Sequence, residues 1–312
     1  MWRLCRQMLV GVGLYVSFGL IWGQDGQSCR SRDVVVNVSD VSGTFVGGLE
    51  PASFRVTLDH QATPIISDRV QHSEARVILL LDVSGSISRS NHNWEEARFI
   101  AGHFVSSTAG KLSVALVIFS DHVIETLGFG HSSHDMLQRL SNLEDGRGST
   151  SLYDSLVYAA HLFQDTQKGD ALYVVTDGGD NHSKSREQDV ERELTSRGIR
   201  LFWAPLSNEP FVTQEENQGQ EEMQRLVEAS GGRVVKTGDV TSAAERKHFD
   251  SMAKSAYDTM GTFYVLQLAT PWNAEGHSWN LAVTDSDGKK LKNLKVSYPA
   301  RLPVCTTLAT AR

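Results

Sequence analysis

The chain has 312 residues, a length that suits about two domains, with the 40% hydrophobic and 21% charged residues of an ordinary globular protein. Its formal net charge is −7, its sequence pI is about 5.9, and no stripe of lysine and arginine is interleaved with aromatic residues. This balance argues against a nucleic-acid partner, and a mild acidic excess mainly favours solubility.

The N-terminus has the pattern of a secretory signal peptide. Arg3 and Arg6 precede an apolar stretch at residues 8–22, and small residues near Gly23 would admit signal peptidase. The stretch is short for a membrane-spanning helix, which needs about 20 residues. We expect residues 1–23 to be cleaved and the mature protein to work outside the cytoplasm, in the periplasm or secreted. An uncleaved anchor is the alternative, and only then would the protein be attached to a membrane.

Three cysteines occur in the chain. Cys5 lies in the segment expected to be removed, which leaves Cys29 and Cys305, one near each end of the mature chain. In an oxidising compartment such a pair is a candidate disulfide, and two unpaired thiols are the alternative. No spacing of cysteine and histidine predicts a zinc site.

The N-terminal segment of the mature chain, residues 24–74, is predicted to form β-strands. Phe54, Val56 and Leu58 alternate with polar neighbours, which is the period-two pattern of a half-buried strand.

The C-terminal segment, residues 259–312, is also predicted to be β, with a hairpin turn at residues 285–288 between strands at 279–283 and 294–296. Neither flank alone would bury much core, because a few strands need a partner face. We expect the two flanks to pack together as one small β-sandwich, whose ends a Cys29–Cys305 bridge would tie.

The segment between the flanks, residues 75–258, alternates two patterns. Apolar runs read as buried strands, and apolar stripes at helical spacing lie between them; examples of the stripes are Ala97, Ile100, Ala101 and Phe104. This alternation predicts an α/β fold with a doubly wound, mostly parallel sheet, inserted between the two flanks.

Polar residues follow two of the buried strands. Asp82, Ser84 and Ser86 come directly after the apolar run at residues 77–81, and Asp177 closes the run at 172–175. A loop at residues 148–154, rich in hydroxyls, leads into a helix. Ligands of open α/β sheets bind beyond the carboxyl ends of the strands, and oxygen ligands suit a hard cation such as Mg²⁺. The alternative is ordinary turn and helix-cap chemistry.

Together these three segments resemble a von Willebrand factor type A (VWA) domain with its metal-ion-dependent adhesion site. That family has Asp-x-Ser-x-Ser, then a Thr in a Gly-rich loop, then an Asp that closes a later strand. The positions that match are Asp82, Ser84, Ser86, Thr150 and Asp177. Ser149 stands where many members have a second Gly. The resemblance implies a Rossmann-like fold and a bound Mg²⁺, with Mn²⁺ or Ca²⁺ as alternatives. It also implies a protein partner whose Asp or Glu completes the coordination.

The order of parts also resembles the bacterial subgroup of VWFA-related Acidobacteria domain proteins. The loose motifs that carry this resemblance lie at residues 37–40, 47–49 and 54–56, before the central domain, and at 264–266 after it. The Gly-rich nucleotide fingerprint is absent.

The loop after Asp177 contains Asp180, Asn181 and His182, which we expect at the rim of the same face. These residues either shape the choice of partner or form a solvated polar loop. No nucleophile elbow, phosphate loop or zinc-protease motif is present, so we do not expect an enzyme. The sequence favours an extracytoplasmic binding module that captures an acidic residue through a metal ion. A structural envelope protein stabilised by the metal, and a hydrolase using it, are the alternatives.

Overall fold

The computed structural model describes residues 31–72, 75–87, 93–144, 146–206, 214–236, 240, 242–271, 274 and 277–303. The predicted signal peptide and both cysteines of the predicted disulfide, Cys29 and Cys305, lie outside these residues. Within them, no helix combines the length and apolar character needed to cross a membrane.

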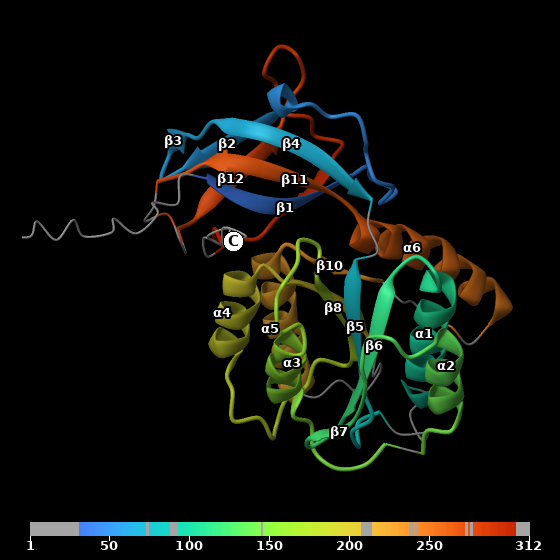
Figure 1. The fold of residues 1–312 in the computed structure, drawn as a ribbon. Coiled ribbons are helices and arrows are strands. Elements are labelled where there is room, and N and C mark those ends of the chain that lie inside the picture. The colour runs from blue at the N-terminus through green and yellow to red at the C-terminus, as the bar shows by residue number, and fades with distance from the viewer. Residues whose placement is uncertain are drawn as a thin grey trace, which may run out of the picture.

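A six-stranded sheet forms the centre of the molecule (Figure 1). Its spatial order is β10-β9-β8-β5-β6-β7, and every neighbouring pair is parallel except β6 and β7. The strands are β5 (Arg76–Asp82), β6 (Ser113–Phe119), β7 (Val123–Leu127), β8 (Ala171–Thr176), β9 (Arg200–Pro205) and β10 (Arg233–Val234).

Helices cover both faces of this sheet (Figure 1). One face packs against α1 (Asn93–Thr108), α2 (Ser133–Ser141) and α6 (Ala243–Gly261). The other packs against α3 (Leu152–His161), α4 (Glu187–Arg197) and α5 (Gln214–Ser230). The sequence of β5 does not alternate between apolar and polar residues because both faces of the strand are buried. Its successive side chains enter opposite cores, and both cores are apolar.

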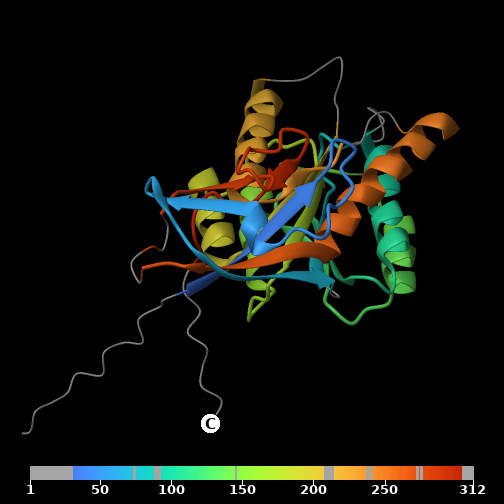
Figure 2. The same cartoon turned by 90° about the horizontal axis from the view of Figure 1, so that it is seen from above.

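The two flanks of the chain form a small β-sandwich above the central sheet (Figures 1 and 2). One of its sheets has the order β13-β1-β11-β4, and the other has the order β12-β2-β3. The strands are β1 (Ser31–Ser39), β2 (Phe54–Leu58), β3 (Gln61–Ala62), β4 (Ile65–His72), β11 (Thr262–Ala269), β12 (Trp279–Val283) and β13 (Lys295–Ser297), with a 3₁₀ turn, η1 (Pro51–Ser53), before β2.

The two small sheets share one apolar core, to which Val36, Val56, Tyr264 and Trp279 contribute. The fold is therefore α/β and doubly wound, with a β-sandwich built from both flanks, which confirms the predicted fold class. The domain boundaries after residues 74 and 258 stay predictions.

The predicted hairpin between β12 and β13 is wrong in one respect. The turn at residues 285–288 forms, with Gly288 N donating to Asp285 O over 3.0 Å. However, β12 pairs with β2, and β13 pairs with β1 in the other sheet. The short bridge between Thr284 and Lys290 closes the turn, and the chain then crosses to the other sheet.

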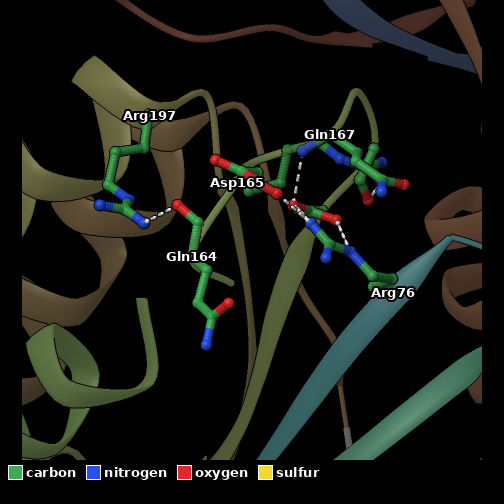
Figure 3. Close-up of polar contacts among 8 residues, drawn as sticks. Arg76, Gln164, Asp165, Gln167 and Arg197 are labelled. Carbon is green, nitrogen blue, oxygen red and sulfur yellow. Dashed lines mark hydrogen bonds and ion pairs between the residues drawn. The ribbon is translucent and has the colours of Figure 1, made fainter. Parts of the chain in front are cut away.

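Polar contacts tie the amino ends of the central strands to their loops at the end that faces the sandwich (Figure 3). Arg76, the first residue of β5, binds both carboxylate oxygens of Asp170, over 3.0 Å from Nε and 2.6 Å from Nη2. Arg197, at the end of α4, donates to Gln164 O.

Arg200, the first residue of β9, joins the two domains. It is fully buried, and its guanidinium donates to Asn37 Oδ1 on β1 and to three backbone oxygens, those of Gly169, Thr259 and Met260. Two of these carbonyls belong to the last turn of α6, where a cation is favourable. The end of the sheet near the sandwich is thus occupied by structural contacts, and the carboxyl ends of β5 and β8 lie at the opposite end (Figure 1).

Candidate metal site

The first polar loop starts at Asp82, the last residue of β5, which is completely buried. Its Oδ1 accepts a hydrogen bond from Ser84 N over 2.9 Å, and its Oδ2 accepts one from the Thr176 hydroxyl over 2.6 Å. The Ser84 and Ser86 hydroxyl oxygens lie 3.2 Å apart. The Asp-x-Ser-x-Ser segment therefore gathers its three oxygen-bearing side chains within one tight turn.

The second polar loop, which leads to Thr150, is joined to the first by backbone hydrogen bonds, and we call this pair of contacts the clasp. Gly85 N donates to Gly148 O over 2.9 Å, and Arg147 N donates to Val83 O over 3.0 Å. A Cβ on Gly146 would stand only 2.4 Å from Ser84 O, so this close approach requires glycine.

Thr150 lies two residues beyond this clasp and is buried. Its backbone is bonded to the loop after β8: its N–H donates to Asn181 Oδ1 over 2.9 Å, and its carbonyl accepts from the N–H groups of Asn181 and His182. The second and third polar loops therefore position each other.

Asp177 follows β8 directly and is also buried. Strands β5 and β8 are parallel neighbours with Leu81 opposite Val175, so their carboxyl ends bring Asp82 and Asp177 to the same edge. Asp177 Oδ1 accepts a hydrogen bond from Gly179 N over 3.1 Å.

The two carboxylates affect each other electrostatically. Burial, and then the negative charge of Asp177, raise the pKa of Asp82 to about 7, although hydrogen bonds from Thr176 and Ser84 act in the opposite direction. These two donors are neutral groups, so they do not compensate a buried pair of negative charges. A divalent cation bound beside both carboxylates would do so.

The donor set fits a hard cation. It consists of two carboxylates and three hydroxyls, and it contains no nitrogen or sulfur ligand. Among the residues that the structure describes, no group of three or more His, Cys, Asp or Glu side chains has metal-site spacing. A site made by the five predicted residues would thus depend on hydroxyl oxygens as well as on Asp82 and Asp177.

The three predicted rim residues lie beside Thr150 and the start of α3. Asp180 Oδ2 accepts hydrogen bonds from Tyr153 N over 2.9 Å and from the Ser183 hydroxyl over 2.5 Å, which secures the start of α3. The Asn181 side chain accepts the hydrogen bond from Thr150 N that is described above. The side chains of Asn181 and His182 are exposed.

Two groups that support the polar loops at this edge of the sheet were not predicted from the sequence. The Thr176 hydroxyl holds Asp82, and the turn between β6 and β7 supports the Thr150 loop, because Ser151 N donates to Ser120 O and the Ser151 hydroxyl donates to Asp121 O, each over 2.7 Å. Thr176 is the residue before Asp177, and Asp121 lies two residues after the end of β6. Both could have been found by asking what else lies at the carboxyl ends of the strands.

The doubly wound α/β domain, with three polar loops meeting at the carboxyl edge of its sheet, has the arrangement expected of a VWA domain. A family model described as "VWA domain containing CoxE-like protein" matches residues 51–244, more than half of the chain. The chain therefore belongs to this family, whose VWA domains often mediate interactions between proteins.

Solved structures of low sequence identity are also similar. The conserved hypothetical protein BatB from Bacteroides thetaiotaomicron is 16% identical, with 58% of this chain and 98% of that chain covered and a TM-score of 0.45. The von Willebrand factor type A protein from Catenulispora acidiphila is 13% identical (89% and 75% covered, TM-score 0.46). Manganese-loaded TRAP protein from Plasmodium vivax is 17% identical (77% and 98% covered, TM-score 0.42). A comparison with curated proteins finds no match.

Proposed function

We propose that this protein is an extracytoplasmic binding module that captures an acidic side chain of a protein partner through a divalent metal ion. Asp82, Ser84, Ser86, Thr150 and Asp177 would hold the ion. The observation that supports this most strongly is the buried pair of carboxylates, Asp82 and Asp177, at the edge where the hydroxyl-bearing loops meet. Mg²⁺ is the favoured ion, with Mn²⁺ and Ca²⁺ as alternatives.

Each part of the chain has a distinct task in this proposal. Asp82, fixed by Thr176 and by the backbone of Ser84, and Asp177, fixed by Gly179, supply negative charge. The hydroxyls of Ser84, Ser86 and Thr150 supply neutral oxygens. When bound, the ion supplies a coordination position that solvent or a carboxylate can take, because Mg²⁺ in proteins usually keeps several waters.

The exposed rim would select the partner. Asn181 and His182 have exposed side chains next to Thr150, and Asp180 fixes the loop that carries them. The N-terminal signal-like sequence supports a location in the periplasm or outside the cell. The lack of nucleophile and phosphate-loop motifs in the sequence supports binding without catalysis.

The proposal is tested by affinity capture from the envelope fraction with Mg²⁺ and then with EDTA. A captured protein is purified, and its binding is measured against the wild-type chain and the Asp177→Asn variant. We expect binding that requires metal, is lost in the variant, and depends on one Asp or Glu of the partner. Binding that is unchanged by EDTA would refute it.

The alternative role, a structural envelope protein, gives a different result. In that case metal would raise the melting temperature of the wild-type chain, but no partner would bind more tightly to the metal-loaded form. A hydrolase would show metal-dependent turnover in a broad substrate screen.

A further inference from the structure

Helix α5 approaches the third polar loop unusually closely. A Cβ on Gly219, in the second turn of α5, would stand 2.1 Å from Gly178 O, and a Cβ on Gly178 would stand 3.3 Å from Gln220 N. Gly219 must therefore be glycine for this backbone-to-backbone contact, and the φ of 93° at Gly178 also favours glycine there. The Tyr153 hydroxyl of α3 also donates to the carboxylate of Glu222, one turn further along α5. The start of α5 is thereby held over the loop that carries Asp177.

This contact brings a third carboxylate beside the candidate metal site. A Cβ on Gly179 would stand 3.6 Å from Asp177 Oδ1 and 3.7 Å from Glu215 Oε1, so both oxygens border the space that the missing side chain leaves. Glu215 lies in the first turn of α5 and is exposed. Among the described residues, none forms a hydrogen bond or ion pair with its carboxylate.

The Glu215 carboxylate lies next to the candidate metal site but outside the set of five predicted ligands. No three carboxylates among the described residues are spaced to share an ion. An exposed glutamate can, however, reach a neighbouring position by rotating its side chain, because its rotamers are not fixed by packing. The Glu216 Cγ also borders this space, 3.9 Å from the position of a Cβ on Gly179, but Gly179 itself adds no side chain between Glu215 and Asp177.

We propose that Glu215 is an internal competitor for the metal position that the partner's carboxylate takes. With an ion bound, the Glu215 carboxylate turns toward Asp177 and coordinates the ion in place of a water molecule. A partner's Asp or Glu must then displace it, so the site is restrained when no partner is present. This inference rests on the proposed function, because it requires an ion at the five predicted residues.

The test uses Mn²⁺ as the ion and acetate as a simple carboxylate. The affinity for Mn²⁺ is measured by calorimetry, and the exchangeable water on bound Mn²⁺ by water-proton relaxation, for the wild type and Glu215→Gln. Glu221→Gln is the matched control, because it removes the same charge from an exposed position on the same helix. Gly179→Ala is a second variant, whose methyl group would occupy the space between Asp177 and Glu215 without changing the charge.

We expect Glu215→Gln to weaken Mn²⁺ binding by roughly tenfold or more, by comparison with the loss of groups near other metal sites. Bound Mn²⁺ in that variant should relax water protons faster, as one more water exchanges, and acetate should slow this relaxation at lower concentration than in the wild type. Gly179→Ala should show the same gain in water access, and Glu221→Gln should behave like the wild type.

Equal relaxation and equal acetate response in the wild type and Glu215→Gln would overturn the inference and leave the proposed function standing. A similar loss of affinity in Glu221→Gln, without any change in water access, would also overturn it, since that is a general charge effect. A wild-type chain that takes up no Mn²⁺ would refute the proposed function and this inference together.

Discussion

Replacing Asp82 with Asn should stabilise the metal-free protein at pH 8 and abolish its metal binding. In the folded chain, burial and the charge of Asp177 raise the pKa of Asp82 from its ordinary value of 3.8 to about 7. The folded state therefore binds this proton more tightly than the unfolded state does. Stability that is present below pH 4 is lost as the pH rises through about 7.

The magnitude follows from these two pKa values. Each pKa unit corresponds to about 1.4 kcal/mol, so ionised Asp82 costs the metal-free fold roughly 4 kcal/mol at pH 8. An asparagine removes this charge, but its amide cannot accept from both Thr176 and Ser84 through two oxygens as the carboxylate does. Subtracting about 1 kcal/mol or more for one lost hydrogen bond leaves an expected net gain of roughly 2–3 kcal/mol.

The assay is urea unfolding of chelator-treated protein at pH 5 and pH 8, followed by circular dichroism. Asp121→Asn is the control, because Asp121 lies at the same edge of the sheet but is exposed, and its hydrogen bond with His122 lowers the pKa of Asp121. We expect the wild type to lose stability from pH 5 to pH 8, and the Asp82→Asn variant to lose much less. A wild type that is equally stable at both pH values, or a variant that is less stable than the wild type at pH 8, would refute the electrostatic reasoning.

Three further substitutions test other parts of the structure. Thr176→Val removes the hydroxyl that holds Asp82 and should weaken Mn²⁺ binding by roughly tenfold in calorimetry, with the fold retained; an unchanged affinity would contradict this support. Gly146→Ala should also weaken Mn²⁺ binding, because its Cβ would collide with Ser84 O, and normal affinity would show that the clasp between the loops is not needed. Arg200→Met should destabilise the protein by about 3 kcal/mol or more in urea unfolding, because it leaves buried carbonyls without their donor; a loss below about 1 kcal/mol would contradict the role of this residue in joining the domains.

The sequence was sufficient to predict much of the fold because the patterns were local. The apolar run in β5 predicted a strand buried on both faces, and the polar residues after it were therefore expected at the carboxyl edge of the sheet. The pairing of the flanks followed from the need of each to bury an apolar face.

Other features depend on contacts that sequence patterns do not contain. Strand β13 could have paired with β12 across the turn, and it pairs with β1 because the chain crosses between the two small sheets. Strand β7 is short and half-buried at the edge of the central sheet, so its pattern was weak.

The position of α5 relative to the loop after β8 also could not be predicted from the sequence. The contact between Gly178 and Gly219 places Glu215 beside Asp177, although these residues lie far apart in the sequence. Periodicity shows which face of a helix is buried, but not which turn of it reaches a particular loop.

The most direct test of the central claim is a crystal structure of the protein grown with Mn²⁺, with anomalous scattering used to locate the metal. A single anomalous peak is predicted between Asp82 and Asp177, within coordination distance of hydroxyls from Ser84, Ser86 and Thr150. A well-ordered structure at saturating Mn²⁺ with no peak among these side chains would contradict the claim.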